Sequence, residues 1–168
     1  REKGKALLRQ ALKDAESQNL PQRDILKLRA ANKQFVDGDL PGALEEYRMM
    51  REIFPDFMPP WNNSGMILRA LGRYEEAAKM YEKAADLAPH NSIPLSNLWF
   101  TLMDYLKDAK TAETVARRLI DLSPDLALSH NFLGYSLAAQ GRFDEAEKEL
   151  RKTLDLEPDQ PYALPNLA

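Results

Sequence analysis

Apolar residues recur along the chain at the three- and four-residue spacing of amphipathic helices, and no stretch alternates in strand fashion. The clearest stripe ends just before Pro89, which cannot continue a helix. Its members are Tyr74, Ala77, Ala78, Tyr81, Ala84, Ala85 and Leu87. Ahead of it, residues 61–71 form an uninterrupted segment that Gly72 can close in the left-handed conformation. The pattern therefore predicts an all-α chain built from pairs of helices.

The helix pair is repeated. Five prolines are separated by 34, 34, 35 and 34 residues, namely Pro21, Pro55, Pro89, Pro124 and Pro158. An alanine column keeps the same step, at Ala43, Ala77, Ala112 and Ala146. First helices are expected at 24–37, 61–71, 92–105 and 127–140, and second helices at 40–53, 108–121 and 143–156. The second helix of the second repeat is expected to start with residues 73–77 and to end before Pro89. The single slip of one residue is placed in the turn at 105–108.

These repeats define the predicted domain organisation. Residues 1–22 hold a capping helix, with Ala6, Leu7, Leu8, Ala11, Leu12 and Ala15 on one face. Four repeats follow within residues 23–160, at 24–57, 58–91, 92–126 and 127–160. Residues 161–168 begin a fifth repeat or form a second cap. A chain that starts at Arg1 and stops at Ala168 is expected to be a piece of a larger protein.

The columns resemble those of the tetratricopeptide repeat (TPR) family. The fullest match is Trp61, Gly65, Leu68, Gly72, Ala77, Tyr81, Ala84 and Pro89. The resemblance extends over residues 24–160 and points to a bacterial TPR region. It implies a right-handed superhelical solenoid of antiparallel helix pairs, whose first helices line a concave groove. It also implies a non-enzymatic scaffold that binds an extended peptide or helix of a partner protein.

Small residues mark where paired helices approach closely. Ala31, Gly65 and Gly134 occupy this column of the first helices. The third repeat instead has Trp99 or Phe100 there, depending on where the slip falls. We therefore expect a locally altered helix angle, because a large side chain forces the backbone to shift.

The resemblance also assigns the groove. Its residues are Arg29, Asn32, Asn63, Met66, Arg69, Asn97, Phe100, Asn131 and Tyr135. An amide side chain donates and accepts hydrogen bonds at once, so a row of asparagines can pair with a peptide backbone of any sequence. The alternative is that each asparagine bonds a neighbouring repeat. Apolar groove residues would supply the anchors that peptide grooves use.

One TPR function, the clamp on the C-terminal carboxylate of heat-shock chaperones, does not fit. Asn32 and Asn63 fall on its asparagine positions, but its basic positions are Leu28, Ile93 and Asn97. Without cations a pair of carboxylates has no charge-assisted hydrogen bonds.

Composition narrows the chemistry further. The net charge of −3 argues against a nucleic-acid partner, and the chain has no cysteine and two histidines. His130 is expected to be a half-buried packing residue, and no enzyme activity, metal site or cofactor is predicted. The most apolar window, 93–103, is too short to insert into a membrane, so a soluble chain is expected, in the cytoplasm rather than the periplasm.

Two alternative functions stay open. An apolar edge at Leu164–Leu167 would let copies stack into a homo-oligomer through their terminal repeats. The segment at 20–24 is similar to TPR regions attached to bacterial Ser/Thr kinases, which suggests a regulatory domain of a larger signalling enzyme.

Overall fold

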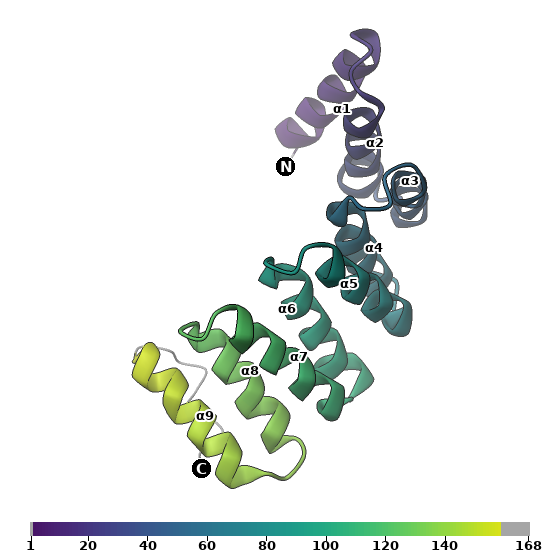
Figure 1. Ribbon diagram of the computed structural model, residues 1–168. Coiled ribbons are helices and arrows are strands. Elements are labelled where there is room, and N and C mark those ends of the chain that lie inside the picture. The colour runs from purple at the N-terminus through teal and green to yellow at the C-terminus, as the bar shows by residue number, and fades with distance from the viewer. Residues whose placement is uncertain (1, 159–168) are drawn as a thin grey trace. The chain divides into compact units, whose positions relative to one another are not determined.

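The computed structural model describes residues 2–158, and these residues form helices and turns without a strand (Figure 1). The helices are α1 (Glu2–Ser17), α2 (Gln22–Ala31), α3 (Leu40–Ile53), α4 (Met58–Ala70), α5 (Tyr74–Leu87), α6 (Ser92–Phe100), α7 (Ala109–Leu122), α8 (Ala127–Ala138) and α9 (Phe143–Leu156). Two π-helical turns extend α2 and α6, η1 (Asn32–Asp37) and η2 (Thr101–Leu106). The all-α prediction is confirmed.

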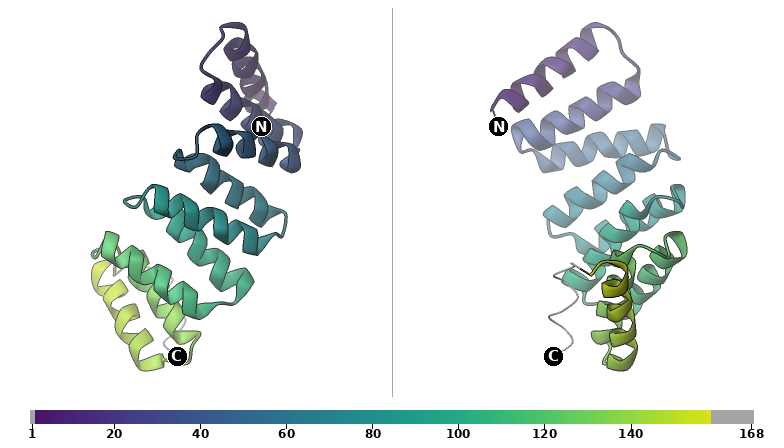
Figure 2. Two further views of the ribbon diagram at one scale, coloured as in Figure 1. Left: turned by 45° about the vertical axis from the view of Figure 1, so that its right-hand side comes forward. Right: turned by 90° about the vertical axis from the view of Figure 1, so that its left-hand side faces the viewer.

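The chain divides into two compact units, with the boundary between Leu87 and Ala88. Unit 1 contains α1 to α5 and unit 2 contains α6 to α9. Within each unit, successive helices lie side by side as antiparallel hairpins (Figure 2). The expected fifth repeat falls at 161–168, outside the described residues.

Two glycines explain how closely the helices of a pair approach. A Cβ atom added to Gly65 of α4 would lie 2.6 Å from Cε1 of Tyr81 on α5. One added to Gly134 of α8 would lie 2.7 Å from Cγ of Leu150 on α9. Both distances are shorter than van der Waals contact, so a larger residue would force the helices apart. The prediction of small residues at these two positions is confirmed.

In the first repeat the prediction is wrong by one residue. Ala30 is fully buried, whereas Ala31 is partly exposed. The cause is the π-helical turn that follows, which fits one more residue into the last turn than an α-helix does. This extra residue shifts the register of α2 relative to Gly38, which adopts the left-handed conformation.

The second π-helical turn, η2, accommodates the one-residue slip of the third repeat. The backbone N–H of Asp108 reaches back six residues to the carbonyl of Leu102, whereas in the second repeat Arg73 reaches back five to Leu68. Lys107 takes the left-handed position, with φ of 55°, that glycine holds in the other repeats. The slip therefore lies within η2, residues 101–106, which overlaps the predicted turn at 105–108 only in residues 105 and 106.

The position of the slip also decides which large residue of the third repeat occupies the small-residue column. Trp99 falls in the small-residue column and is buried, whereas Phe100 is 40% exposed. The altered helix angle expected here stays a prediction.

The N-terminal helix packs on the first repeat, and its role as a cap stays a prediction. Its contact face contains Ala15, which is buried, together with the partly buried Leu8 and Leu12. Ala6 and Leu7 were expected on the same face but are exposed, Leu7 to 64%.

A charged network ties the helices of unit 2 together. The Glu113 carboxylate on α7 accepts hydrogen bonds from Gln140 at 2.9 Å, Arg142 at 2.7 Å and Arg117 at 2.8 Å. Burial opposes the charge of Glu113, but these three donors lower the pKa of Glu113 to about 2. The network links α7 to the turn between α8 and α9.

Candidate functional site

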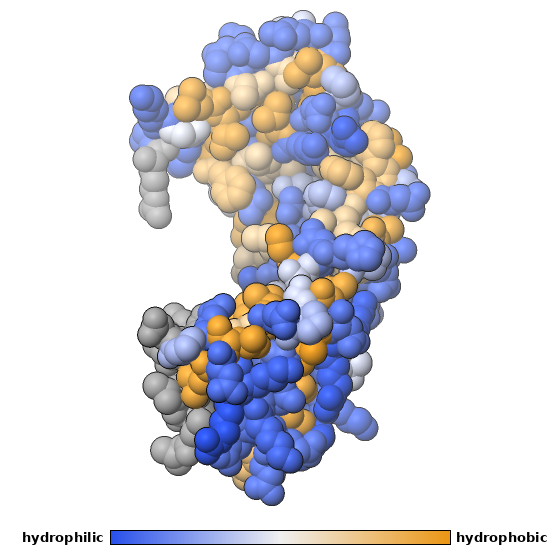
Figure 3. Space-filling view, turned by 60° about the vertical axis from the view of Figure 1, so that its left-hand side comes forward, coloured by the Kyte–Doolittle hydropathy of each residue, from blue (hydrophilic) through white to orange (hydrophobic). Residues whose placement is uncertain are grey.

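The predicted groove residues are divided between the two units. Unit 1 holds Arg29, Asn32, Asn63, Met66 and Arg69, and unit 2 holds Asn97, Phe100, Asn131 and Tyr135. Figure 3 shows hydrophobic side chains at the surface of both units, interrupted by hydrophilic ones. A single row of asparagines through all the repeats stays a prediction, and each unit is described below by itself.

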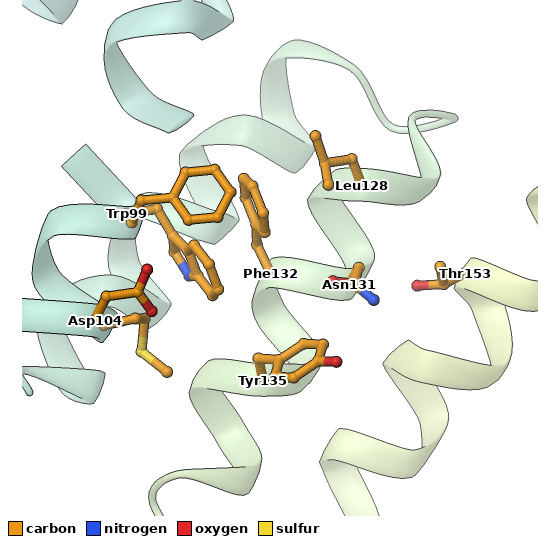
Figure 4. A pocket seen from close by; sticks show the side chains of 9 residues that line it. Trp99, Asp104, Leu128, Asn131, Phe132, Tyr135 and Thr153 are labelled. Carbon is orange, nitrogen blue, oxygen red and sulfur yellow. The ribbon is translucent and has the colours of Figure 1, made fainter. Parts of the chain in front are cut away.

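Three of the four residues in unit 2 line one pocket. It has a volume of about 410 Å³ and lies between α6–η2 and α8, with one residue from α9 (Figure 4). Its lining consists of Trp99, Phe100, Met103, Asp104, Leu128, Asn131, Phe132, Tyr135 and Thr153. Asn97 is not among these residues.

Three aromatic rings form one wall of the pocket. Trp99 and Phe132 are stacked, with ring centroids 4.0 Å apart and planes at 9°. Phe100 meets both rings edge to face, at 5.3 Å from Trp99 and 5.2 Å from Phe132. The indole Nε1–H of Trp99 donates to Oγ of Ser136 at 2.9 Å, which fixes the ring toward α8. Such pairs contribute beyond the area that they bury, so this wall is rigid.

Sequence reasoning missed Trp99 as a pocket residue. From the sequence, the bulk of Trp99 is expected to push α6 and α7 apart. In the structure its indole instead faces α8, the first helix of the following repeat. The available signal was the aromatic content of two adjacent first helices, at Trp99 and Phe100 in one and Phe132 in the other.

Polar groups stand on opposite sides of the aromatic wall. Asp104 lies on the η2 side and is exposed. Asn131 of α8 and Thr153 of α9 lie on the other side (Figure 4). The Thr153 hydroxyl is directed to the carbonyl groups of Ala127 and Glu149. Asn131 is only 8% exposed, and its amide has no hydrogen bond within residues 2–158. The Asn131 amide atoms are not among the fully buried polar groups that lack a partner, so water in the pocket can hydrogen-bond this amide and a ligand can replace that water.

In the first repeat, two predicted groove residues hold the N-terminal helix. The amide of Asn32 donates to the backbone carbonyl of Leu8 at 3.0 Å and is buried. Arg29 pairs with Glu16 at 2.8 Å. Helix α1 therefore occupies the surface that these two side chains would offer to a peptide.

In the second repeat, Asn63 bonds the neighbouring repeat. Its amide donates to the Tyr47 hydroxyl of α3 at 3.2 Å, which is the alternative role considered for these asparagines. Burial raises the pKa of Tyr47, and this hydrogen bond partly offsets the effect. Met66 stays exposed, and the Arg69 guanidinium lies 6.0 Å from the centre of the Tyr81 ring.

His130 has a structural environment. It is buried rather than half-buried, with Nδ1 at 2.7 Å from the Glu149 carboxylate and Nε2 at 2.8 Å from the Pro124 carbonyl. Across the described part of the chain, no three His, Asp or Glu side chains are grouped as a metal site would require. No helix there is long and apolar enough to cross a membrane.

Comparison with known proteins finds the same repeat in two segments of the chain. The family model for the tetratricopeptide repeat matches residues 59–91 and 127–160. A curated relative, the STIP1 homolog of Dictyostelium discoideum, is 32% identical over 98 residues, which are 58% of this chain but only 17% of that protein.

Solved structures agree on the fold. MamA from Desulfovibrio magneticus RS-1 has a TM-score of 0.70 at 19% identity, over 82% of this chain and 77% of that one. The first TPR domain of Spaghetti (RPAP3), bound to the HSP90 peptide SRMEEVD, has a TM-score of 0.56 at 25% identity. That likeness covers 61% of this chain and 81% of the RPAP3 chain.

Proposed function

We propose that this chain, two segments of which match the tetratricopeptide repeat, is a non-enzymatic protein-interaction module with its principal peptide anchor in unit 2. The observation that carries the proposal is the pocket between α6–η2 and α8. It gathers Phe100, Asn131 and Tyr135, which the groove assignment had selected from sequence alone, around a stacked Trp99–Phe132 pair.

The pocket suits one side chain of an extended peptide. Its aromatic wall offers apolar surface to a leucine-sized or aromatic side chain, and hot spots of protein interfaces are pockets of this kind. The unpartnered amide of Asn131 can donate to a peptide carbonyl and accept from a peptide N–H at the same time. An apolar anchor combined with backbone pairing defines peptide recognition that depends weakly on sequence.

The acidic tail bound by the RPAP3 domain is not the ligand that we propose. Leu28, Ile93 and Asn97 stand where the chaperone clamp has cations, and Asn32 is buried beneath α1. These three positions therefore lack the cations that such a tail needs, and Asn32 lacks the access.

The test is selection of peptides from a random display library on the purified chain, followed by NMR titration of ¹⁵N-labelled protein. We expect the bound peptides to shift the amide resonances of Phe100, Asn131 and Tyr135. Tyr135→Ala should weaken binding about tenfold, because an aromatic anchor contributes 1 kcal/mol or more to an interface. Phe143→Ala is the matched control, since Phe143 is an exposed aromatic residue outside the pocket. Shifts confined to the outer faces of α7 and α9 would refute the proposal.

A further inference from the structure

Among the described residues that line the pocket, one carries a charge at neutral pH, and that charge is negative. This residue is Asp104. The Asp104 carboxylate forms no ion pair within residues 2–158, although most of the arginines in the same unit pair with glutamates there. It is also exposed, so a ligand that enters the pocket can reach it.

The position of Asp104 in its helix adds to the negative potential. Helix α6 continues through η2 and ends at Leu106, which places Asp104 in the last turn. The carboxyl end of a helix carries a partial negative charge, so an acidic residue there is unfavourable for the helix itself. A cation beside Asp104 would relieve both the helix end and the unpaired carboxylate.

The aromatic wall lies beside this charge. Figure 4 shows Asp104 on one side of Trp99 and Phe132, with Asn131 on the other side. A ligand that fills the pocket therefore meets a carboxylate, an apolar surface and an unpartnered amide in that order. Lysine and arginine match such a surface well, because their hydrocarbon stems pack on apolar groups while the charged head stays in water.

From this arrangement we infer that the pocket selects a basic peptide segment. An apolar side chain packs on the Trp99–Phe132 pair, an adjacent lysine or arginine pairs with Asp104, and Asn131 bonds the peptide backbone. The inference rests on the proposed function and adds the charge of the partner to it. It also sets this pocket apart from a site for acidic tails.

Three peptides that differ only in charge test the inference. They are acetyl-Gly-Ser-Lys-Leu-Lys-Ser-Gly-amide and its counterparts with glutamate or serine in place of both lysines. Binding is followed by the indole N–H resonance of Trp99, assigned with Trp61→Phe, at low salt. We expect the lysine peptide to bind about two- to fivefold more tightly than the glutamate peptide, which lies within the range of exposed ion pairs.

Charge reversal supplies the matched variants. Asp104→Lys should invert the preference and bind the glutamate peptide more tightly, whereas Asp125→Lys should leave it unchanged. Asp125 is an exposed acid of the same unit that does not line the pocket. Equal or tighter binding of the glutamate or serine peptide to the unmodified chain would overturn the inference and leave the proposed function standing. If no peptide of any charge moves the Trp99 or Asn131 resonances, both are wrong.

Discussion

Replacing Gly65 with alanine tests whether close helix packing governs the repeat columns. The added Cβ would lie 2.6 Å from Cε1 and 2.8 Å from Cδ1 of Tyr81, and ordinary contact begins at 3.4 Å. The ring is fully buried, so it has no free space to move into. The helices or the ring must shift by roughly 0.8 Å to restore contact distance.

The magnitude follows from two opposing effects. Overpacking of a rigid core costs about 1–3 kcal/mol, whereas alanine is favoured over glycine inside a helix by about 1 kcal/mol. We therefore expect Gly65→Ala to lower the free energy of unfolding of unit 1 by about 1 kcal/mol, the middle of the resulting range of about 0–2 kcal/mol. For a unit of this size the melting temperature should fall by about 4–8 °C per kcal/mol.

Urea unfolding with tryptophan fluorescence measures this change. Trp61 lies in unit 1 and Trp99 in unit 2, so a Trp99→Phe background reports on unit 1 alone. Gly134→Ala is the matched substitution in unit 2, followed through Trp99 in a Trp61→Phe background. Its Cβ would lie 2.7 Å from Cγ and 2.8 Å from Cδ2 of the buried Leu150, so a comparable loss of stability is expected in unit 2. The reasoning fails if either substitution leaves the unfolding midpoint of its unit unchanged.

Three further predictions concern stability and the cap. Lys107→Gly should stabilise unit 2 by about 1 kcal/mol in urea unfolding, because Lys107 holds a φ of 55° that glycine adopts without strain; an unchanged midpoint would contradict this. The pKa of Glu113 is lowered from 4.5 to about 2 in the folded chain, by hydrogen bonds that outweigh the effect of burial. Its contribution of about 1–3 kcal/mol is therefore complete above pH 4.5 and lost as the pH falls toward 2, and a Glu113→Gln variant should lack this acid dependence in unfolding titrations. Asn32→Ala removes the hydrogen bond to Leu8, so amide exchange within α1 should accelerate roughly five- to tenfold, and equal rates would show that the cap is held by other contacts.

Much of the fold could be predicted from the sequence because its signals are local. The second helices of the first and fourth repeats, 40–53 and 143–156, have the predicted limits, and that of the third repeat is shifted by one residue. The errors arise where a helix departs from α geometry. Neither π-helical turn has a signature in a single sequence, and each shifts the register by one residue, so Ala30 replaced Ala31 in the core.

The candidate site was predictable in part. Phe100, Asn131 and Tyr135 were selected from their repeat positions, and the structure places all three at one pocket. Repeat position could not foresee that Asn32 bonds α1 or that Asn63 bonds Tyr47, because an amide pairs with whichever acceptor or donor the neighbouring helix presents.

The sequence by itself determined the helices, their pairing and their repetition, since helical periodicity, proline stops and small-residue columns all act over a few residues. Only the tertiary structure decided which neighbouring helix a given side chain contacts. The indole of Trp99 lies against Phe132, 33 residues further along the chain, and that contact creates the pocket wall. The geometry of this pocket wall depends on the register of α6, which the following turn η2 sets, and on the position of α8. Neither can be inferred from the residues of α6 alone.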